Sequence, residues 1–188
     1  MSNILKPLTK EEFNILSKIK FNNINEGFEN YTSGILSVEE SKDGEDFKDY
    51  NLKYESRFIN FVKEAFILNN RKPILIDFYL KDLESESILK ILDLLDYDDK
   101  LIFIDNLKAL KEDTIYFLVE EEGLIPFLTR LSTREIFFIT MYFTEVPLAL
   151  WGNYNLSFPM FFKGERALNS YLNIAKNNSL LIRDISYK

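Results

Sequence analysis

The side chains in this sequence that could do chemistry are almost all carboxylates. The chain contains 30 aspartate and glutamate residues but no histidine and no cysteine. Imidazole is the commonest general base and metal ligand near neutral pH, so its absence argues against most hydrolase, nuclease and metalloenzyme designs. Without cysteine there is no thiolate nucleophile, no disulfide and no thiolate zinc site, which fits a reducing compartment best.

The densest group of oxygen ligands is the run Asp96-Tyr97-Asp98-Asp99. An EF-hand loop beginning at Asp96 would need glycine at its sixth position and glutamate at its twelfth, where this chain has Leu101 and Leu107. We therefore exclude calcium binding by this motif, and we expect neither a metal site nor a cofactor.

A second arrangement combines Asp77, at the end of a predicted strand, with Asp98-Asp99-Lys100. It loosely resembles the acid plus Asp-x-Lys pattern of the restriction-endonuclease-like nucleases, in which carboxylates hold magnesium and the lysine assists the attacking water. The triplet is common by chance, lies in a hydrophilic turn and has no basic groove beside it. A glycosidase would need only two carboxylates, and the sequence singles out no pair. A carboxylate-dependent hydrolase or nuclease-like enzyme, with or without a magnesium requirement, is the alternative hypothesis.

The acidic charge is concentrated in the middle of the chain. Residues 1–76 carry 12 acids and 11 bases, residues 77–122 carry 14 and 5, and residues 123–188 carry 4 and 7, so the segments have net charges of −1, −9 and +3. A net charge of −7 disfavours nucleic acid as a partner. The middle segment predicts a surface for a basic protein, whereas the alternative is a solvated face that keeps the protein soluble. The predicted partner-binding acids are Asp93, Asp96, Asp98, Asp99, Glu120, Glu121 and Glu122.

The segment Trp151-Gly152-Asn153-Tyr154 adds two aromatic candidates to this interface. Tryptophan and tyrosine are favoured as interface anchors, so Trp151 and Tyr154 could form an exposed binding loop. The alternative is a hairpin turn whose aromatic rings pack beside the core.

The elements that position these residues are organised around 136–162. Its first eight residues contain one polar side chain, Thr140, and predict a buried strand. Pro147 interrupts the run, and Gly152-Asn153 predicts a chain reversal, so we expect a hairpin. Beyond the turn, alternate residues from Leu156 to Phe162 should share one face, and Pro159 predicts an edge strand.

Helical spacing elsewhere predicts amphipathic helices around this sheet. Thr9 and Glu12 form a capping-box pattern for a helix whose apolar stripe continues to Ile19. We expect further helices at 56–69, at 85–95 with Ser85 or Ser87 as cap, from 101 through 110, as two pieces within 113–131, and at 167–175. The run at 101–105 is short enough that a buried strand is the alternative there. We expect strands at 74–80, at 35–38 and at the end of the chain beside the hairpin, and a mobile acidic loop at about 39–55.

These elements predict a single α+β domain over residues 1–188, with a small, mostly antiparallel, aromatic-rich sheet packed against several amphipathic helices. The first residues lack the apolar stretch of a signal peptide, and the apolar run before Glu145 is too short to span a bilayer. We therefore expect a cytoplasmic protein without a membrane segment.

An acidic, cysteine-free α+β chain of under 200 residues that ends in WGNYNLSFPMFF, a helix and a last strand resembles the small cytoplasmic immunity proteins of bacterial contact-dependent inhibition and other polymorphic toxin systems. The resemblance implies a non-enzymatic protein that binds and neutralises one cognate toxin domain, often a basic nuclease. It implies no particular functional residue. A regulatory binding subunit without a toxin is a further hypothesis, because it too needs only a surface.

Overall fold

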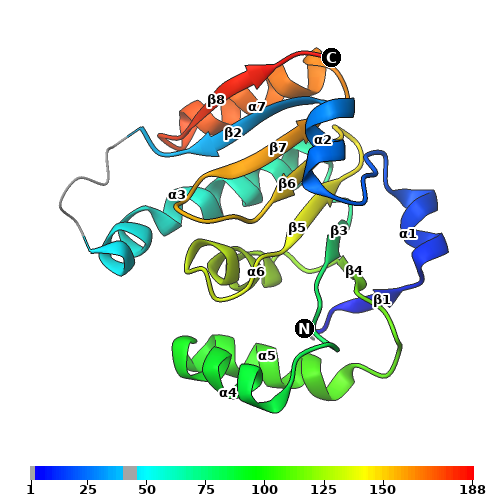
Figure 1. Ribbon diagram of the computed structural model, residues 1–188, viewed down its shortest axis with the longest axis vertical. Helices are drawn as coiled ribbons and strands as arrows, with labels where there is room; N and C mark the ends of the chain where they lie inside the picture. Colours follow the sequence, from blue (N-terminus) through cyan, green and yellow to red (C-terminus); the bar gives the residue numbers. More distant parts are fainter. Residues whose placement is uncertain (1–2, 40–45) are drawn as a thin grey trace.

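The computed structural model describes residues 3–39 and 46–188 and centres on one eight-stranded sheet (Figure 1). All seven strand pairings in the described ranges are antiparallel. Across the sheet the order is β1 (Lys6–Leu8), β4 (Tyr116–Val119), β3 (Ile74–Asp77), β5 (Thr140–Phe143), β6 (Leu148–Trp151), β7 (Phe158–Phe162), β2 (Thr32–Ser37) and β8 (Leu181–Ser186). The predicted α+β class is confirmed, although the sheet is larger than the small one expected.

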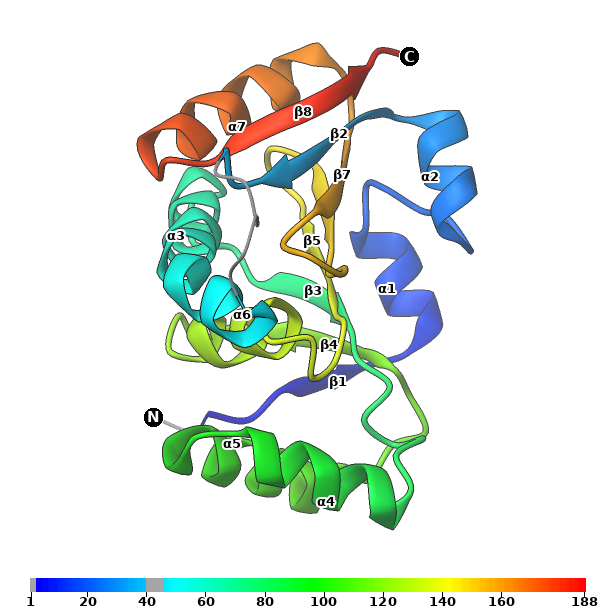
Figure 2. The same cartoon turned by 60° about the vertical axis from the view of Figure 1, so that its left-hand side comes forward.

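Helices cover both faces of this sheet, as Figure 2 shows. On one face lie α3 (Phe47–Leu68), α6 (Leu124–Thr133) and α7 (Glu165–Asn177), and on the other lie α1 (Lys10–Leu16) and α2 (Ile24–Asn30). The remaining pair, α4 (Ser85–Leu94) and α5 (Tyr97–Ala109), lies beyond β1 at the end of the molecule opposite β8. None of the helices in the described ranges is both long enough and apolar enough to cross a membrane.

Alternation along the strands divides the interior into two clusters, because successive side chains point to opposite faces. In β3, Ile74 and Ile76 join the large cluster under α3, α6 and α7, whereas Leu75 joins the smaller cluster under α1. The expected shared face in the last third of the chain is confirmed, since Leu156, Phe158, Met160 and Phe162 all lie in the large cluster.

Several predicted helices are confirmed. The capping box at the start of α1 is formed, with the Thr9 hydroxyl accepting from the Glu12 amide and the Glu12 carboxylate accepting from the Thr9 amide. This helix ends at Leu16, earlier than expected. Ile19 is buried, but it belongs to the segment that follows the helix. The helices predicted at 56–69, 85–95, 101–110 and 167–175 are present as α3, α4, α5 and α7. The first of them, α3, begins nine residues before Ser56.

The prediction of two helical pieces within 113–131 was half wrong. Residues Tyr116–Val119 form the buried strand β4, and only the part after Gly123 is helical, as α6. Pro126 lies in the first turn of that helix, where backbone amides have no intrahelical acceptor. The amide hydrogen that proline lacks therefore costs the helix no hydrogen bond. The physical reason for the error is that Tyr116 and Leu118 face one cluster while Phe117 and Val119 face the other, so both faces of this strand are apolar.

The predicted hairpin is a meander of three strands with two reversals. The strand begins at Thr140 rather than at Ile136, and the first reversal contains Pro147 and joins β5 to β6. The second follows Trp151 and joins β6 to β7. Pro159 does not lie on an edge strand, because β7 pairs with both β6 and β2. It lies opposite Ile35 of β2, while the register with β6 begins one residue later.

Two expectations in the N-terminal half and at the chain end also changed. The predicted strand at 35–38 is present as the longer β2, and α2 precedes it where only irregular structure was expected. The last strand, β8, pairs with β2 and not with the hairpin. Of the predicted mobile loop at 39–55, residues 40–45 lie outside the described residues, and residues 47–55 are helical, as the start of α3.

Candidate functional site

The helix pair α4 and α5 is attached to the body of the molecule through one apolar side. Ile91 and Leu95 of the first helix region and Phe103 of the second are buried in the large core cluster. The predicted serine caps of α4 are not formed, because Glu84 occupies the cap position and makes no side-chain cap hydrogen bond. Asn106 ties α5 to the N-terminal segment, accepting from the Leu5 amide at 2.7 Å and donating to the Asn3 carbonyl at 2.8 Å.

Four large apolar side chains of this pair are exposed to solvent. Leu89 is 63% exposed, Leu94 50%, Tyr97 74% and Leu101 46%. Tyr97 and Leu101 are four residues apart on α5 and therefore lie next to each other on its surface. Isolated exposed apolar residues are normal, but four large ones on two consecutive helices are a feature that needs an explanation.

Acidic residues accompany these apolar side chains. From Glu84 to Leu110 the chain carries seven acids and three lysines, a net charge of −4. We define the α4–α5 surface as the four exposed apolar residues together with the exposed acids of the same helices, which are Glu86, Asp93, Asp98 and Asp105. Lys90 is exposed here as well, but its charge is paired with Glu86 at 2.8 Å.

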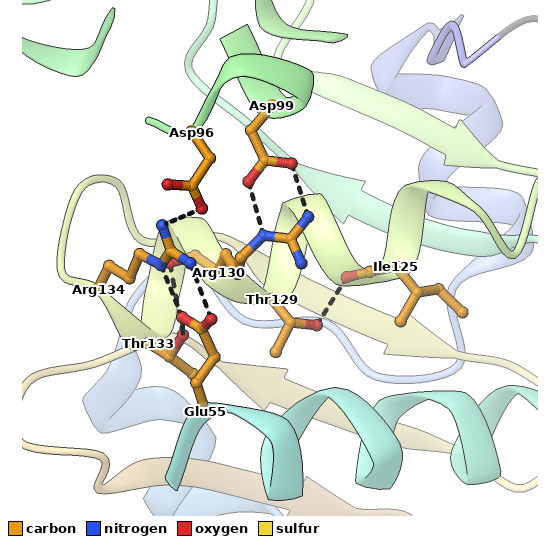
Figure 3. A network of polar contacts seen from close by, with 8 residues as sticks. All are labelled: Glu55, Asp96, Asp99, Ile125, Thr129, Arg130, Thr133 and Arg134. Carbon is orange, nitrogen blue, oxygen red and sulfur yellow. Dashed lines mark hydrogen bonds and ion pairs between the residues drawn. The ribbon is translucent and has the colours of Figure 1, made fainter. Parts of the chain in front are cut away.

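Arg130 of α6 and Arg134, the residue directly after that helix, hold the start of α5 in place (Figure 3). Arg130 donates to both carboxylate oxygens of Asp99, from Nε and from Nη2, at 2.6 Å each. Arg134 donates to Asp96 at 2.8 Å and to both oxygens of Glu55 on α3, at 2.8 and 2.9 Å. These hydrogen bonds raise the pKa of both arginines further above its ordinary value. The network joins α3, α5 and α6 into one unit.

The predicted acids of this segment therefore divide into two kinds. Asp93 and Asp98 are exposed, as a partner-binding role requires. Asp96 is exposed but paired with Arg134. Asp99 is 1% exposed and bonded through both oxygens to Arg130, so its charge is used inside the molecule and does not belong to the surface.

The other predicted acids lie at the end of β4 and are partly paired. Glu120 lies 3.6 Å from Lys6, and Glu122 lies 2.9 Å from Arg71. Glu121 is half-buried. These pairs are solvent-exposed and contribute little to stability, so Glu120 and Glu122 can exchange their partners for groups of another protein.

The predicted aromatic loop is divided between the interior and the surface. Trp151 belongs to β6 and packs half-buried against the smaller cluster on the α1 face. Tyr154 is 59% exposed and its ring contacts Phe138 edge-on, with 4.6 Å between ring centroids. Only Tyr154 is available as an exposed aromatic anchor.

The carboxylates of the nuclease-like hypothesis are not brought together. Asp77 lies on the α1 face of the sheet, where it lines a cavity with residues of α1, whereas Asp99 is bonded to α6 on the other face (Figure 2). Across the described ranges no group of three or more carboxylates is placed to hold a metal ion.

Sequence reasoning missed Glu55, Arg130 and Arg134, the residues that fix the position of α5. One signal was present: the segment after residue 122 has a net charge of +3, opposite to the −9 of the acidic segment before it. Part of the segregation of charge along the chain is internal complementarity between these two segments. Comparison of the chain with protein-family models, with curated protein sequences and with solved structures gave no match.

Proposed function

We propose that this chain is a non-enzymatic binding protein that docks a basic partner protein on the α4–α5 surface. In the form suggested by the immunity-protein resemblance, the partner is a cognate toxin domain that is neutralised by binding in the cytoplasm. The observation that carries the proposal is the group of exposed apolar side chains, Leu89, Leu94, Tyr97 and Leu101, set among exposed carboxylates.

The composition of this surface suits an interface. Protein interfaces have an apolar centre enriched in aromatic residues and a polar rim. Tyr97, with 74% of its surface exposed, supplies a rigid aromatic group, and such residues dominate measured binding energies. A purely solvated face would need the charges alone, so the exposed apolar residues favour the binding hypothesis over that alternative.

The charge on this surface specifies the kind of partner. Asp99 is paired with Arg130 inside the molecule, but exposed acids still outnumber the exposed lysines of the helix pair. Their excess negative charge attracts a basic protein, raises its association rate and orients it on approach. The ion pairs from Arg130 and Arg134 hold α5 on the body of the molecule before the partner arrives. A surface that is already ordered loses less conformational entropy on binding.

The experiment is a pull-down from lysate of the native cells, at low and at high salt, with mass spectrometry of the retained proteins. We expect one basic protein, retained in near-equal amount at low salt and less at high salt, because salt screens exposed charges. The identity of that protein separates a toxin domain from the target of a regulatory subunit.

A matched pair of bait variants assigns the contact to this surface. Tyr97→Ala combined with Asp93→Asn removes one exposed ring and one exposed carboxylate from the α4–α5 surface, and retention should fall by about tenfold or more. Tyr187→Ala combined with Glu29→Gln removes the same groups elsewhere, because Tyr187 is 59% exposed and Glu29 is exposed on α2. Equal retention by the two variants would remove the α4–α5 surface from the account.

A further inference from the structure

A cavity of about 200 Å³ is lined by residues of α1 and of the sheet. Figure 2 shows that α1 covers the face of the sheet opposite α3. Its walls come from α1, from the segment that follows it, and from β3, β4, β5 and β6. A wider hollow of about 860 Å³ lies beside it, but the charges there include Lys81 and Asp113, which pair with each other at 2.5 Å. The residues that line the smaller cavity include Phe13, Phe21, Asp77, Tyr116, Tyr142 and Trp151.

Aromatic rings form a continuous wall around this cavity. Phe13 stacks on Tyr116 at 4.2 Å between centroids and meets Tyr142 edge-on at 5.1 Å. Phe21 lies 6.2 Å from Tyr142 and 5.7 Å from Trp151. The faces of such rings carry negative charge density and attract cations, most strongly when the cation is desolvated.

Asp77 places one carboxylate inside this aromatic wall. Its Oδ1 accepts from the Thr140 amide at 2.9 Å, and its Oδ2 accepts from the Tyr142 hydroxyl at 3.2 Å. Both donors are neutral, and in the described part of the chain no lysine or arginine pairs with Asp77 within 4.0 Å. Burial raises the pKa of Asp77, and burial together with the charge of Asp77 raises that of Tyr142.

A carboxylate that is half-buried without a cationic partner is an unfavourable arrangement for stability alone. A cationic ligand would supply the missing partner, and the surrounding rings would attract the same ligand. From this juxtaposition we propose that the cavity binds a small organic ammonium group, with Asp77 as its counter-ion and Phe21, Tyr142 and Trp151 as the aromatic surfaces around it.

The dimensions of the cavity restrict the ligand. A volume of 200 Å³ corresponds to about seven water molecules at roughly 30 Å³ each and is below the roughly 300 Å³ at which drug-sized pockets begin. This volume suits a quaternary ammonium group with a short tail. Lys10 and Lys20 are exposed and line the cavity from α1 and the following segment, so they suit a ligand whose tail is neutral or anionic.

Trp151 is the only tryptophan in the chain, so its fluorescence reports on this cavity directly. The experiment titrates choline into the wild-type protein, with sodium chloride at equal ionic strength as reference. A parallel titration uses 3,3-dimethyl-1-butanol, which has the shape of choline without its charge. Calorimetry on the same samples gives a second readout. We expect saturable binding of choline and at least about tenfold weaker binding of the neutral analogue.

Two variants test the assigned roles. Asp77→Asn keeps an oxygen for the Thr140 amide but removes the charge, and it should abolish the preference for choline over the alcohol. Asp82→Asn removes an exposed carboxylate outside the cavity and should leave that preference unchanged. Equal affinities of wild-type protein for the two compounds, or no binding of choline by either readout, would overturn the proposal, and both results are independent of whether the variants fold.

Discussion

Arg130 binds Asp99 through two parallel hydrogen bonds of 2.6 Å, and this pair fixes the first turn of α5 on α6. The Asp99 side chain is 1% exposed and that of Arg130 is 22% exposed, so most of the pair is removed from water. Asp99 also lies in the first turn of its helix, where a negative charge interacts favourably with the helix dipole. The acidic segment is therefore anchored by one of its own acids.

Loss of this arginine should destabilise the protein strongly. Arg130→Met keeps much of the side-chain volume but leaves the Asp99 carboxylate buried without a partner. Removing one partner of a buried pair costs about 3–5 kcal/mol, and we expect the free energy of unfolding, measured by urea denaturation, to fall by that amount. The matched control is Arg71→Met, which breaks the exposed pair with Glu122 and should cost less than about 1 kcal/mol. Similar losses in both variants would contradict this role for Asp99.

Asn69 should be as sensitive, because it holds the reversal between β5 and β6. It is 1% exposed, and its Oδ1 accepts from the amides of Glu145 at 3.0 Å and Val146 at 2.8 Å. Its Nδ2 donates to the Tyr171 hydroxyl, which in turn donates to the Val146 carbonyl. Asn69→Ala leaves these buried groups without partners, so we expect a loss of about 3 kcal/mol on denaturation.

The control for Asn69 is an exposed asparagine. Asn30→Ala removes a single hydrogen bond to the Glu26 carbonyl on the surface of α2 and should change the free energy of unfolding by less than about 1 kcal/mol. If Asn69→Ala were as mild as Asn30→Ala, the buried network would not determine the geometry of this turn.

Asp77 makes the stability of the fold depend on pH. Burial raises its pKa in the folded state above the ordinary value, so the folded protein binds this proton more tightly than the unfolded chain. The resulting stabilisation is complete below the ordinary pKa of about 3.9 and is lost as the pH rises through the raised value. We therefore expect Asp77→Asn to be more stable than the wild type at pH 7, with the difference shrinking as the pH falls towards 4.

Thermal unfolding of both proteins across this pH range measures the effect. Subtracting the wild-type curve from that of the variant removes the titration of the other groups around the cavity, which include Lys10, Lys20, Tyr79, Tyr116 and Tyr142. A stability difference between the variant and the wild type that stays constant or grows as the pH falls would contradict this prediction. It would show that the charged form of Asp77 does not destabilise the fold.

The sequence allowed prediction of those elements in which one local signal dominates. The capping pattern at Thr9 and Glu12 predicted the start of α1, and apolar residues at helical spacing predicted α3, α4 and α7. Strand β4 was missed because all four residues from Tyr116 to Val119 are apolar. Such a run lacks the alternation of a half-exposed strand and can equally be part of a helix. Pro159 suggested an edge, but which strands flank β7 depends on where β2 returns to the sheet, and this contact is long-range.

The candidate sites were only partly predictable for the same reason. The excess of acids in the middle segment was visible, but the buried position of Asp99 depends on Arg130, 31 residues away. The cavity around Asp77 combines residues from α1, four strands and three connecting segments, which no local pattern brings together. The exposure of Tyr97 and Leu101 likewise follows from which side of α5 faces the core.

The most direct test of the central proposal is site-specific photocrosslinking in the native cells. A photoreactive phenylalanine analogue replaces Tyr97 on the α4–α5 surface or, as a control, Tyr187. Tyr187 directly follows β8, which lies at the end of the molecule opposite α4 and α5. We predict that position 97 crosslinks to one basic protein and that position 187 does not. Crosslinking to the same protein from position 187 alone, or no crosslinked protein from position 97, would contradict the assignment of this surface as the binding site.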